Sequence, residues 1–124
     1  MDSHSLDALT VLVADDDADM RLYLRGCLLG MGAARVIEAA DGPEALRLAA
    51  GSDLVITDVR MPGMDGHALC CALRAGADTR SLPLLLVSGE APAGPGPCAD
   101  GFLAKPFNAA GLRAAVEHVL ALPP

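Results

Sequence analysis

Five short apolar runs alternate along the chain with segments of helical periodicity, and this alternation limits the possible folds more than any other feature. The runs are residues 10–14, 34–38, 54–57, 84–87 and 101–104. Strands that are apolar along their whole length are typical of a parallel sheet with both faces covered by helices. The sequence therefore predicts an α/β fold with a five-stranded parallel sheet.

Four of the intervening segments have helical signals. The first places apolar residues on one helix face: Met20, Leu24, Cys27, Leu28 and Met31. A second helix is predicted to open at 41–43, with proline in its first turn. A third should span about 65–75, and Asn108 is the expected N-cap of the last helix.

The segment after the fourth strand cannot form an ordinary helix. Residues 90–100 contain Pro92, Pro95 and Pro97 together with Gly94 and Gly96. Proline removes a helical hydrogen bond, and glycine raises the entropic cost of helix formation. We therefore expect a loop or a single turn where the alternating pattern calls for a helix.

Length and charge exclude several classes of protein. A chain of 124 residues fits one domain. We expect this domain to span 1–124, with a core of about 10–121 and a flexible N-terminus at 1–8. Sixteen acidic residues against nine basic ones give a net charge of -7, which argues against nucleic-acid and anionic-membrane surfaces. The sequence lacks a secretory leader and an apolar run of roughly 18 residues. We expect a cytoplasmic location.

The four cysteines have no metal-binding or disulfide spacing. No C-x-x-C spacing occurs among Cys27, Cys70, Cys71 and Cys98, so the sequence predicts neither a zinc site nor a disulfide framework. Cys27, Cys70 and Cys71 lie in helical stretches, where small apolar thiols of the core are the simpler interpretation.

Acidic residues follow two of the predicted strands. Asp15 and Asp16 come directly after the first strand, and Asp58 follows the third. In a sheet of order 2-1-3-4-5 these strands are neighbours, and ligands bind at their carboxyl ends. Three carboxylates in one crevice repel each other unless a cation joins them. Oxygen ligands of this kind suit Mg2+.

The acidic residues between positions 15 and 19 fit other known patterns less well. Asp17 and Asp19 are explained as a helix cap and a first-turn charge. An EF-hand fails because Met20 and Gly26 occupy the positions that need glycine and glutamate. A phosphohydrolase of the haloacid dehalogenase type matches Asp15 and Asp17, but Asp19 stands where that motif has Thr or Val.

Taken together, several motifs resemble the receiver domain of bacterial response regulators. They are the acidic pair, the segment Asp58-Val-Arg-Met-Pro-Gly-Met-Asp-Gly66, Ser88-Gly89 and Lys105-Pro106, in the family's order from about residue 10 to 120. The resemblance implies a flavodoxin-like three-layer fold with sheet order 2-1-3-4-5. It also implies transfer of a phosphoryl group from a histidine kinase or a histidine phosphotransfer protein.

The resemblance assigns roles residue by residue. Asp58 is the expected phosphoacceptor. Asp15, Asp16, Asp58 and the backbone carbonyl of Arg60 are the expected Mg2+ ligands, with Mn2+ a possible substitute. Ser88 and Lys105 are expected to contact the phosphoryl group, and Ser88 and Phe102 to form the switch. The family usually has a cis bond at the Lys105-Pro106 step.

Several of these roles also have a physical explanation that does not depend on the resemblance. Lys105 is the only lysine of the chain and lies in the apolar run Phe-Leu-Ala-Lys-Pro-Phe, where a cation can stabilise the charge of a transferring phosphoryl group. Ser88 can donate one hydrogen bond or serve as a strand-end cap. Core packing explains Phe102 as well as a switch does.

The expected function is that of a phosphorylatable receiver, freestanding or part of a larger chain, which modifies only itself and is no conventional enzyme. A pseudo-receiver that binds partners without phosphorylation is the alternative. Kinase choice should depend on Arg21, Leu22 and Arg25 of the first helix, and the downstream target is unknown. Without a fourth helix, the usual dimer through the fourth and fifth helices is not expected. Arg60 and Glu90 could pair as a lid over the site.

Overall fold

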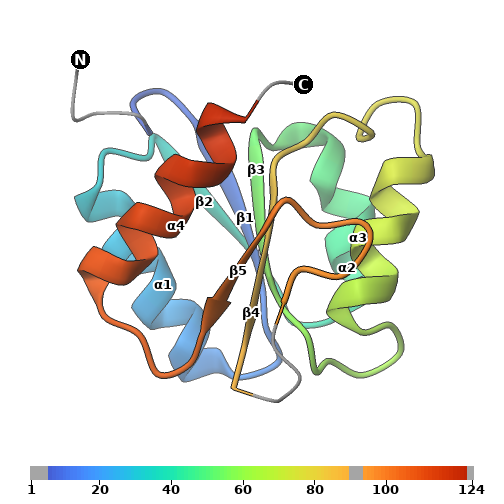
Figure 1. Ribbon diagram of the computed structural model, residues 1–124, viewed down its shortest axis with the longest axis horizontal. Helices are drawn as coiled ribbons and strands as arrows, with labels where there is room; N and C mark the ends of the chain where they lie inside the picture. Colours follow the sequence, from blue (N-terminus) through green and yellow to red (C-terminus); the bar gives the residue numbers. More distant parts are fainter. Residues whose placement is uncertain (1–5, 90–93, 123–124) are drawn as a thin grey trace.

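The computed structural model describes residues 6–89 and 94–122 of the chain. Its five strands form one parallel sheet of order β2-β1-β3-β4-β5 (Figure 1), as predicted. The strands are β1 (Thr10–Ala14), β2 (Arg35–Ala39), β3 (Leu54–Asp58), β4 (Leu84–Ser88) and β5 (Gly101–Ala104). Their bounds differ from the apolar runs by one residue at most. The order places β1 and β3 side by side at the centre.

Three of the four α-helices in the described residues connect strands and the fourth follows β5, and each begins at a polar cap. They are α1 (Ala18–Gly30), α2 (Gly42–Leu48), α3 (Gly66–Ala75) and α4 (Ala109–Ala121), and the short 3-10 helix η1 (Ala49–Gly51) follows α2. The caps are Asp17, Asp41, Asp65 and Asn108, and each side chain accepts a hydrogen bond from a backbone N–H of the first turn. These bonds satisfy N–H groups that have no partner inside the helix.

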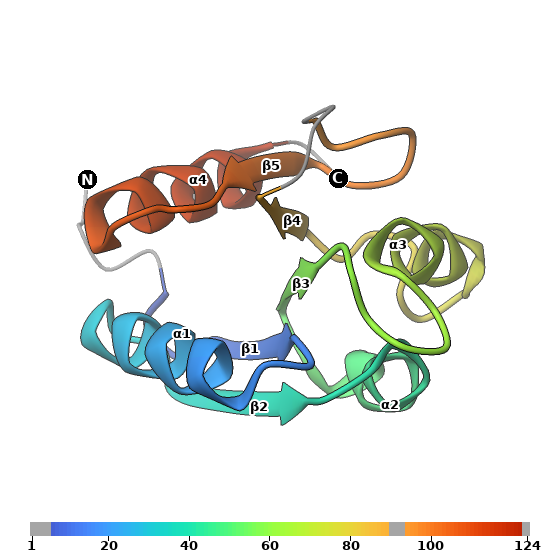
Figure 2. The same cartoon turned by 90° about the horizontal axis from the view of Figure 1, so that it is seen from below.

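The helices cover both faces of the sheet, which gives three layers. Figure 2 shows α1 and α4 on one face and α2 and α3 on the other. Successive strand residues point to opposite faces, so Val11 and Val13 join the cluster under α1 and α4, while Leu12 joins the cluster under α2 and α3. The central strands are therefore fixed by two separate cores.

The connection between β4 and β5 has no helix in its described part. Residues 94–100 form a bend and a turn, as the proline and glycine content predicts, and residues 90–93 lie outside the described residues. Figure 1 shows this connection extending toward α3. A loop thus takes the place of one crossover helix.

The core reaches closer to the N-terminus than expected. Leu6 is only 1% exposed and belongs to the cluster under α1 and α4, and Asp7 forms an antiparallel bridge with Ala33. Flexibility was predicted for 1–8, but residues 6–8 are held by this packing. Residues 1–5 lie outside the described range.

The cysteines require a correction. Cys71 and Cys98 form a disulfide, with 5.1 Å between their Cα atoms, where we expected no disulfide. The two residues are 27 apart in sequence, and only the docking of the β4–β5 connection on α3 brings them together. Cys70 is a buried core thiol, as predicted, and Cys27 is a half-buried free thiol.

None of the helices in the described part of the chain is both long and apolar enough to cross a membrane.

Candidate functional site

Three carboxylates gather where the central strands end. Asp58 is the last residue of β3, and Asp15 and Asp16 follow β1, which pairs with β3 up to Ala14 and Thr57. Asp15, Asp16 and Asp58 each offer one oxygen atom, and these atoms all lie within 4.8 Å of one another. The sheet order therefore produces the acidic crevice that the sequence predicts.

Asp15 is the most enclosed of the three. It is 2% exposed, and its Oδ1 accepts a hydrogen bond from the backbone N–H of Asp17 at 2.9 Å. Burial raises the pKa of Asp15, and the charges of Asp58 and Asp16 add to this effect, while the Asp17 N–H and the Lys105 ammonium oppose it. The protein alone thus stabilises the ionised carboxylate of Asp15 only in part.

Lys105 brings a positive charge to the same crevice. Its Nζ lies 3.4 Å from Asp58 Oδ1 and 3.7 Å from Asp15 Oδ2. The residue follows β5, its backbone N–H donates to the Ser88 carbonyl at 3.0 Å, and its bond to Pro106 is cis, as expected. One ammonium cannot balance three ionised carboxylates, which leaves the crevice with net negative charge.

The donor set fits a hard divalent cation. All three side chains offer oxygen and none offers nitrogen or sulfur, which is the preference of Mg2+. Of the three, Asp16 also lines a hollow of about 480 Å³, together with Arg60 and Asp65, among others. Asp15, Asp16 and Asp58 could therefore hold Mg2+.

The loop after Asp58 is shaped by Gly66. The Gly66 N–H donates to the Val59 carbonyl at 2.8 Å, which closes the loop before α3 begins. A Cβ at Gly66 would collide with the backbone oxygen of Asp58. Glycine is thus required for α3 to start this close to Asp58.

The remaining predicted residues surround the crevice less closely. Ser88 is buried at the end of β4 and pairs with Ala104, next to Lys105. Phe102 is half-buried and packs against the cluster under α2 and α3, so its core interpretation has direct support. Arg60 lines the hollow. Its expected partner in the lid, Glu90, lies outside the described residues.

Sequence reasoning missed the role of Arg21. Its expected part in kinase choice stays a prediction, and in the structure its Nη1 donates to the Asp15 carbonyl at 2.7 Å and its Nε pairs with Glu38 at 3.1 Å. Arg21 thus helps to position the strand end that carries Asp15. Its partner Glu38 lies on β2, and no local pattern reveals that contact. Leu22 beside it is 66% exposed.

Comparison with known proteins places this geometry in a family. The model of the response regulator receiver domain matches residues 11–117. The chain belongs to this family. A chemotaxis protein CheY from Pseudomonas aeruginosa is 33% identical over 122 residues, covering 90% of the chain and 95% of the relative.

Solved receiver structures share the fold. The chemotaxis response regulator CheY4 of Vibrio cholerae superposes with a TM-score of 0.80 at 32% identity, covering 90% of this chain and 98% of that one. The receiver domain of a sensor histidine kinase from Pseudomonas aeruginosa PAO1 has a TM-score of 0.82 at 26% identity, covering 93% and 99%. In that structure a magnesium ion is coordinated in the active site cleft. Receiver domains are signalling domains rather than conventional enzymes.

Proposed function

We propose that the protein is the phosphoacceptor of a two-component phosphorelay and that Asp58 receives the phosphoryl group from a histidine kinase or a histidine phosphotransfer protein. The observation that carries this proposal is the convergence of Asp15, Asp16 and Asp58 with Lys105 at the ends of the central strands. Acidic oxygens and one ammonium are the groups that phosphoryl transfer to a carboxylate needs.

Each residue has a defined task in this proposal. Asp58 supplies the nucleophilic oxygen, and its position at the mouth of the crevice leaves it 12% exposed. Asp15, Asp16, Asp58 and the Arg60 carbonyl hold Mg2+, or Mn2+ in its place. When bound, the ion offsets the carboxylate charges and stabilises the negative charge on the phosphoryl oxygens. The Lys105 ammonium, 3.4 Å from Asp58 Oδ1, provides the second positive group.

Ser88 and Phe102 transmit the change in this proposal. Ser88 donates its hydroxyl to a phosphoryl oxygen, and Phe102 adjusts its packing next to the α2 and α3 cluster. The changed surface then binds a downstream protein in the cytoplasm. The described part of the β4–β5 connection offers no helix for the usual receiver dimer, so we do not expect dimerisation through that face. Dimerisation with beryllofluoride through residues 90–120 would contradict this expectation.

Phosphorylation can be tested with a small phosphodonor. We expect acetyl phosphate and Mg2+ to add one phosphoryl group to the wild type, detected by intact-mass spectrometry. Asp58→Asn should show no adduct because the amide is not a nucleophile, and EDTA should prevent the adduct in the wild type. Asp78→Asn, which changes an exposed carboxylate in the loop after α3, is the matched control and should be modified normally.

The other outcomes identify the alternatives. A correctly folded wild type that binds Mg2+ and forms no adduct would indicate a pseudo-receiver that acts only by binding partners. Release of phosphate in multiple turnovers without an adduct at Asp58 would indicate a phosphohydrolase.

A further inference from the structure

One face of α3 receives the β4–β5 connection in three places. His67, Cys71 and Arg74 are four and three residues apart and therefore share a helix face. A Cβ at Gly96 would lie 2.9 Å from His67 Nδ1. Cys71 is bonded to Cys98. Arg74 reaches the next part of the connection, so the loop follows α3 over two turns.

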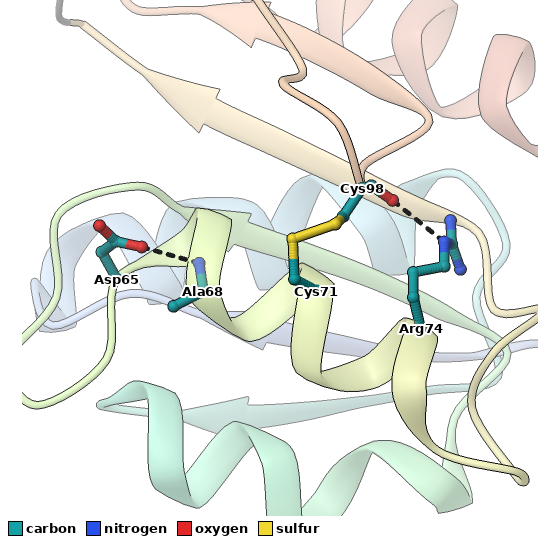
Figure 3. Close-up of a disulfide and its surroundings, with 5 residues drawn as sticks. All are labelled: Asp65, Ala68, Cys71, Arg74 and Cys98. Carbon is teal, nitrogen blue, oxygen red and sulfur yellow. Dashed lines mark hydrogen bonds between the residues drawn. A yellow bond between two sulfur atoms is a disulfide. The ribbon is translucent and has the colours of Figure 1, made fainter.

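The contacts on the two sides of the disulfide differ in strength. Beyond it, Arg74 Nε donates to the Cys98 carbonyl at 3.0 Å (Figure 3), and Arg74 Nη2 pairs with the Asp100 carboxylate at 2.7 Å. Before it, residues 95–97 are exposed, and the close approach of Gly96 to His67 is a contact without a hydrogen bond among the described interactions. The disulfide is thus the main attachment of the segment before Cys98.

We propose that the Cys71–Cys98 disulfide is a redox-controlled clasp, which holds residues 94–97 on α3 when oxidised and releases them when a dithiol reduces it. Arg74 and Asp100 keep the start of β5 in place in both states. The two redox states thus present different surfaces at the position where receivers usually have a helix.

The positions of the sulfur atoms allow this chemistry. Cys71 and Cys98 are both half-buried, so a small dithiol can approach the bond. A thiolate of the dithiol attacks one sulfur, the Cys71–Cys98 bond breaks, and a mixed disulfide forms. The second thiol of the reductant then closes its own disulfide, and two electrons and two protons have passed to the protein as two thiols.

The neighbouring thiol Cys70 does not compete in this exchange. It is buried in the cluster under α2 and α3, and burial raises its pKa to about 12. At neutral pH it is almost entirely protonated, and only the thiolate is nucleophilic. The clasp can therefore open and close without shuffling to Cys70.

The clasp joins the described part of the β4–β5 connection to a helix that begins beside the phosphoryl site. Cys71 lies on α3, whose first residue, Gly66, donates its N–H to the Val59 carbonyl and approaches the Asp58 backbone oxygen closely. We infer that a closed clasp ties residues 94–97 to α3, whereas an open one lets them respond when the site is occupied. This coupling rests on the proposed function, while the clasp itself does not. Disulfides in intracellular proteins are mostly transient and redox-sensing, which agrees with such a control.

Thiol counting and NMR test the clasp. Alkylation with iodoacetamide under denaturing conditions should label two cysteines, Cys27 and Cys70, in protein prepared without reductant. After dithiothreitol it should label all four. In the folded protein, dithiothreitol should lower the heteronuclear NOE of the Gly94 and Gly96 amides. The amides of Gly26 and Gly30 on α1 serve as internal references and should not change. Cys98→Ser should reproduce the reduced state without reductant, and Cys27→Ser should retain the clasp.

Three outcomes would overturn the clasp. Four labels without reductant would show that the bond does not form in solution, and unfolding on reduction would make it a structural cross-link. Unchanged amide mobility on reduction would show that other contacts hold the segment.

Beryllofluoride with Mg2+ tests the coupling. Its effect on the Gly94 and Gly96 amides should be larger after reduction, and an equal effect in both redox states would refute coupling. Failure of the protein to bind beryllofluoride would count against the proposed function alone.

Discussion

Asp15 shows how one buried carboxylate prepares the site for a cation. Its side chain is 2% exposed, and burial together with Asp58 and Asp16 raises its pKa. A raised pKa in the folded state means that the ionised carboxyl destabilises the metal-free fold at neutral pH. This cost is lost as the pH falls through the raised pKa, because the folded chain binds the proton more tightly than the unfolded chain.

We expect protons to compete with Mg2+ at Asp15. As the pH falls from 7, Mg2+ affinity should begin to weaken above the pH at which an ordinary aspartate, with a pKa of 3.8, would titrate. Asp15→Asn should bind Mg2+ roughly tenfold more weakly or worse at neutral pH, with a shallower pH dependence because this proton is gone. Isothermal titration calorimetry from pH 5 to 7 measures both effects. Equal pH profiles for the two proteins would contradict this role of Asp15.

At the scale of elements, α3 and the connection that docks on it show what local sequence can and cannot predict. Strand and helix positions follow from periodicity and caps, and the loop at 94–100 follows from its prolines and glycines. The acidic crevice was predictable because parallel strands end at a common edge. The disulfide and the contacts of Arg74 were not, because their partners are distant in sequence and meet only after α3 and the sheet have packed.

Arg74 is expected to be the main electrostatic anchor of this connection. Its guanidinium donates to the carbonyls of Arg80, Leu82 and Cys98 and pairs with Asp100. Arg74→Met keeps the apolar stem but leaves these acceptors without their donor. Because the pair is about a quarter exposed, we expect a loss of about 2 to 3 kcal/mol of unfolding free energy rather than the full cost for a buried ion pair.

Urea denaturation under oxidising conditions, with the clasp intact in both proteins, measures the effect of Arg74→Met. The matched control is Arg80→Ala, which removes an exposed guanidinium from the adjacent loop and should change stability by no more than about 0.5 kcal/mol. A similar small loss for Arg74→Met would show that solvent replaces its contacts.

At the scale of the whole molecule, the net charge of -7 has a local component. Three of the acidic residues converge at one end of the sheet, opposed by the only lysine of the chain. Two of them adjoin strands whose side chains enter both cores. Because Asp15 and Asp58 are attached to these strands, their charge repulsion lowers the stability of the whole domain. Binding of a cation there should accordingly stabilise the entire domain.

Mg2+ should therefore raise the unfolding free energy of the protein in a saturable manner. A ligand that binds only the folded state stabilises it by RT ln(1 + [L]/Kd), which is about 2.7 kcal/mol at a hundredfold excess over Kd. Urea denaturation at increasing Mg2+ should follow this curve, and EDTA should reverse it. NaCl at matched ionic strength controls for screening of the overall charge.

Asp16→Asn should shift the curve to higher Mg2+, because Asp16 is exposed and its replacement removes a ligand without disturbing a core. If NaCl reproduced the whole effect, or if Asp16→Asn left the curve unchanged, the stabilisation would come from general screening and not from an ion held between Asp15, Asp16 and Asp58.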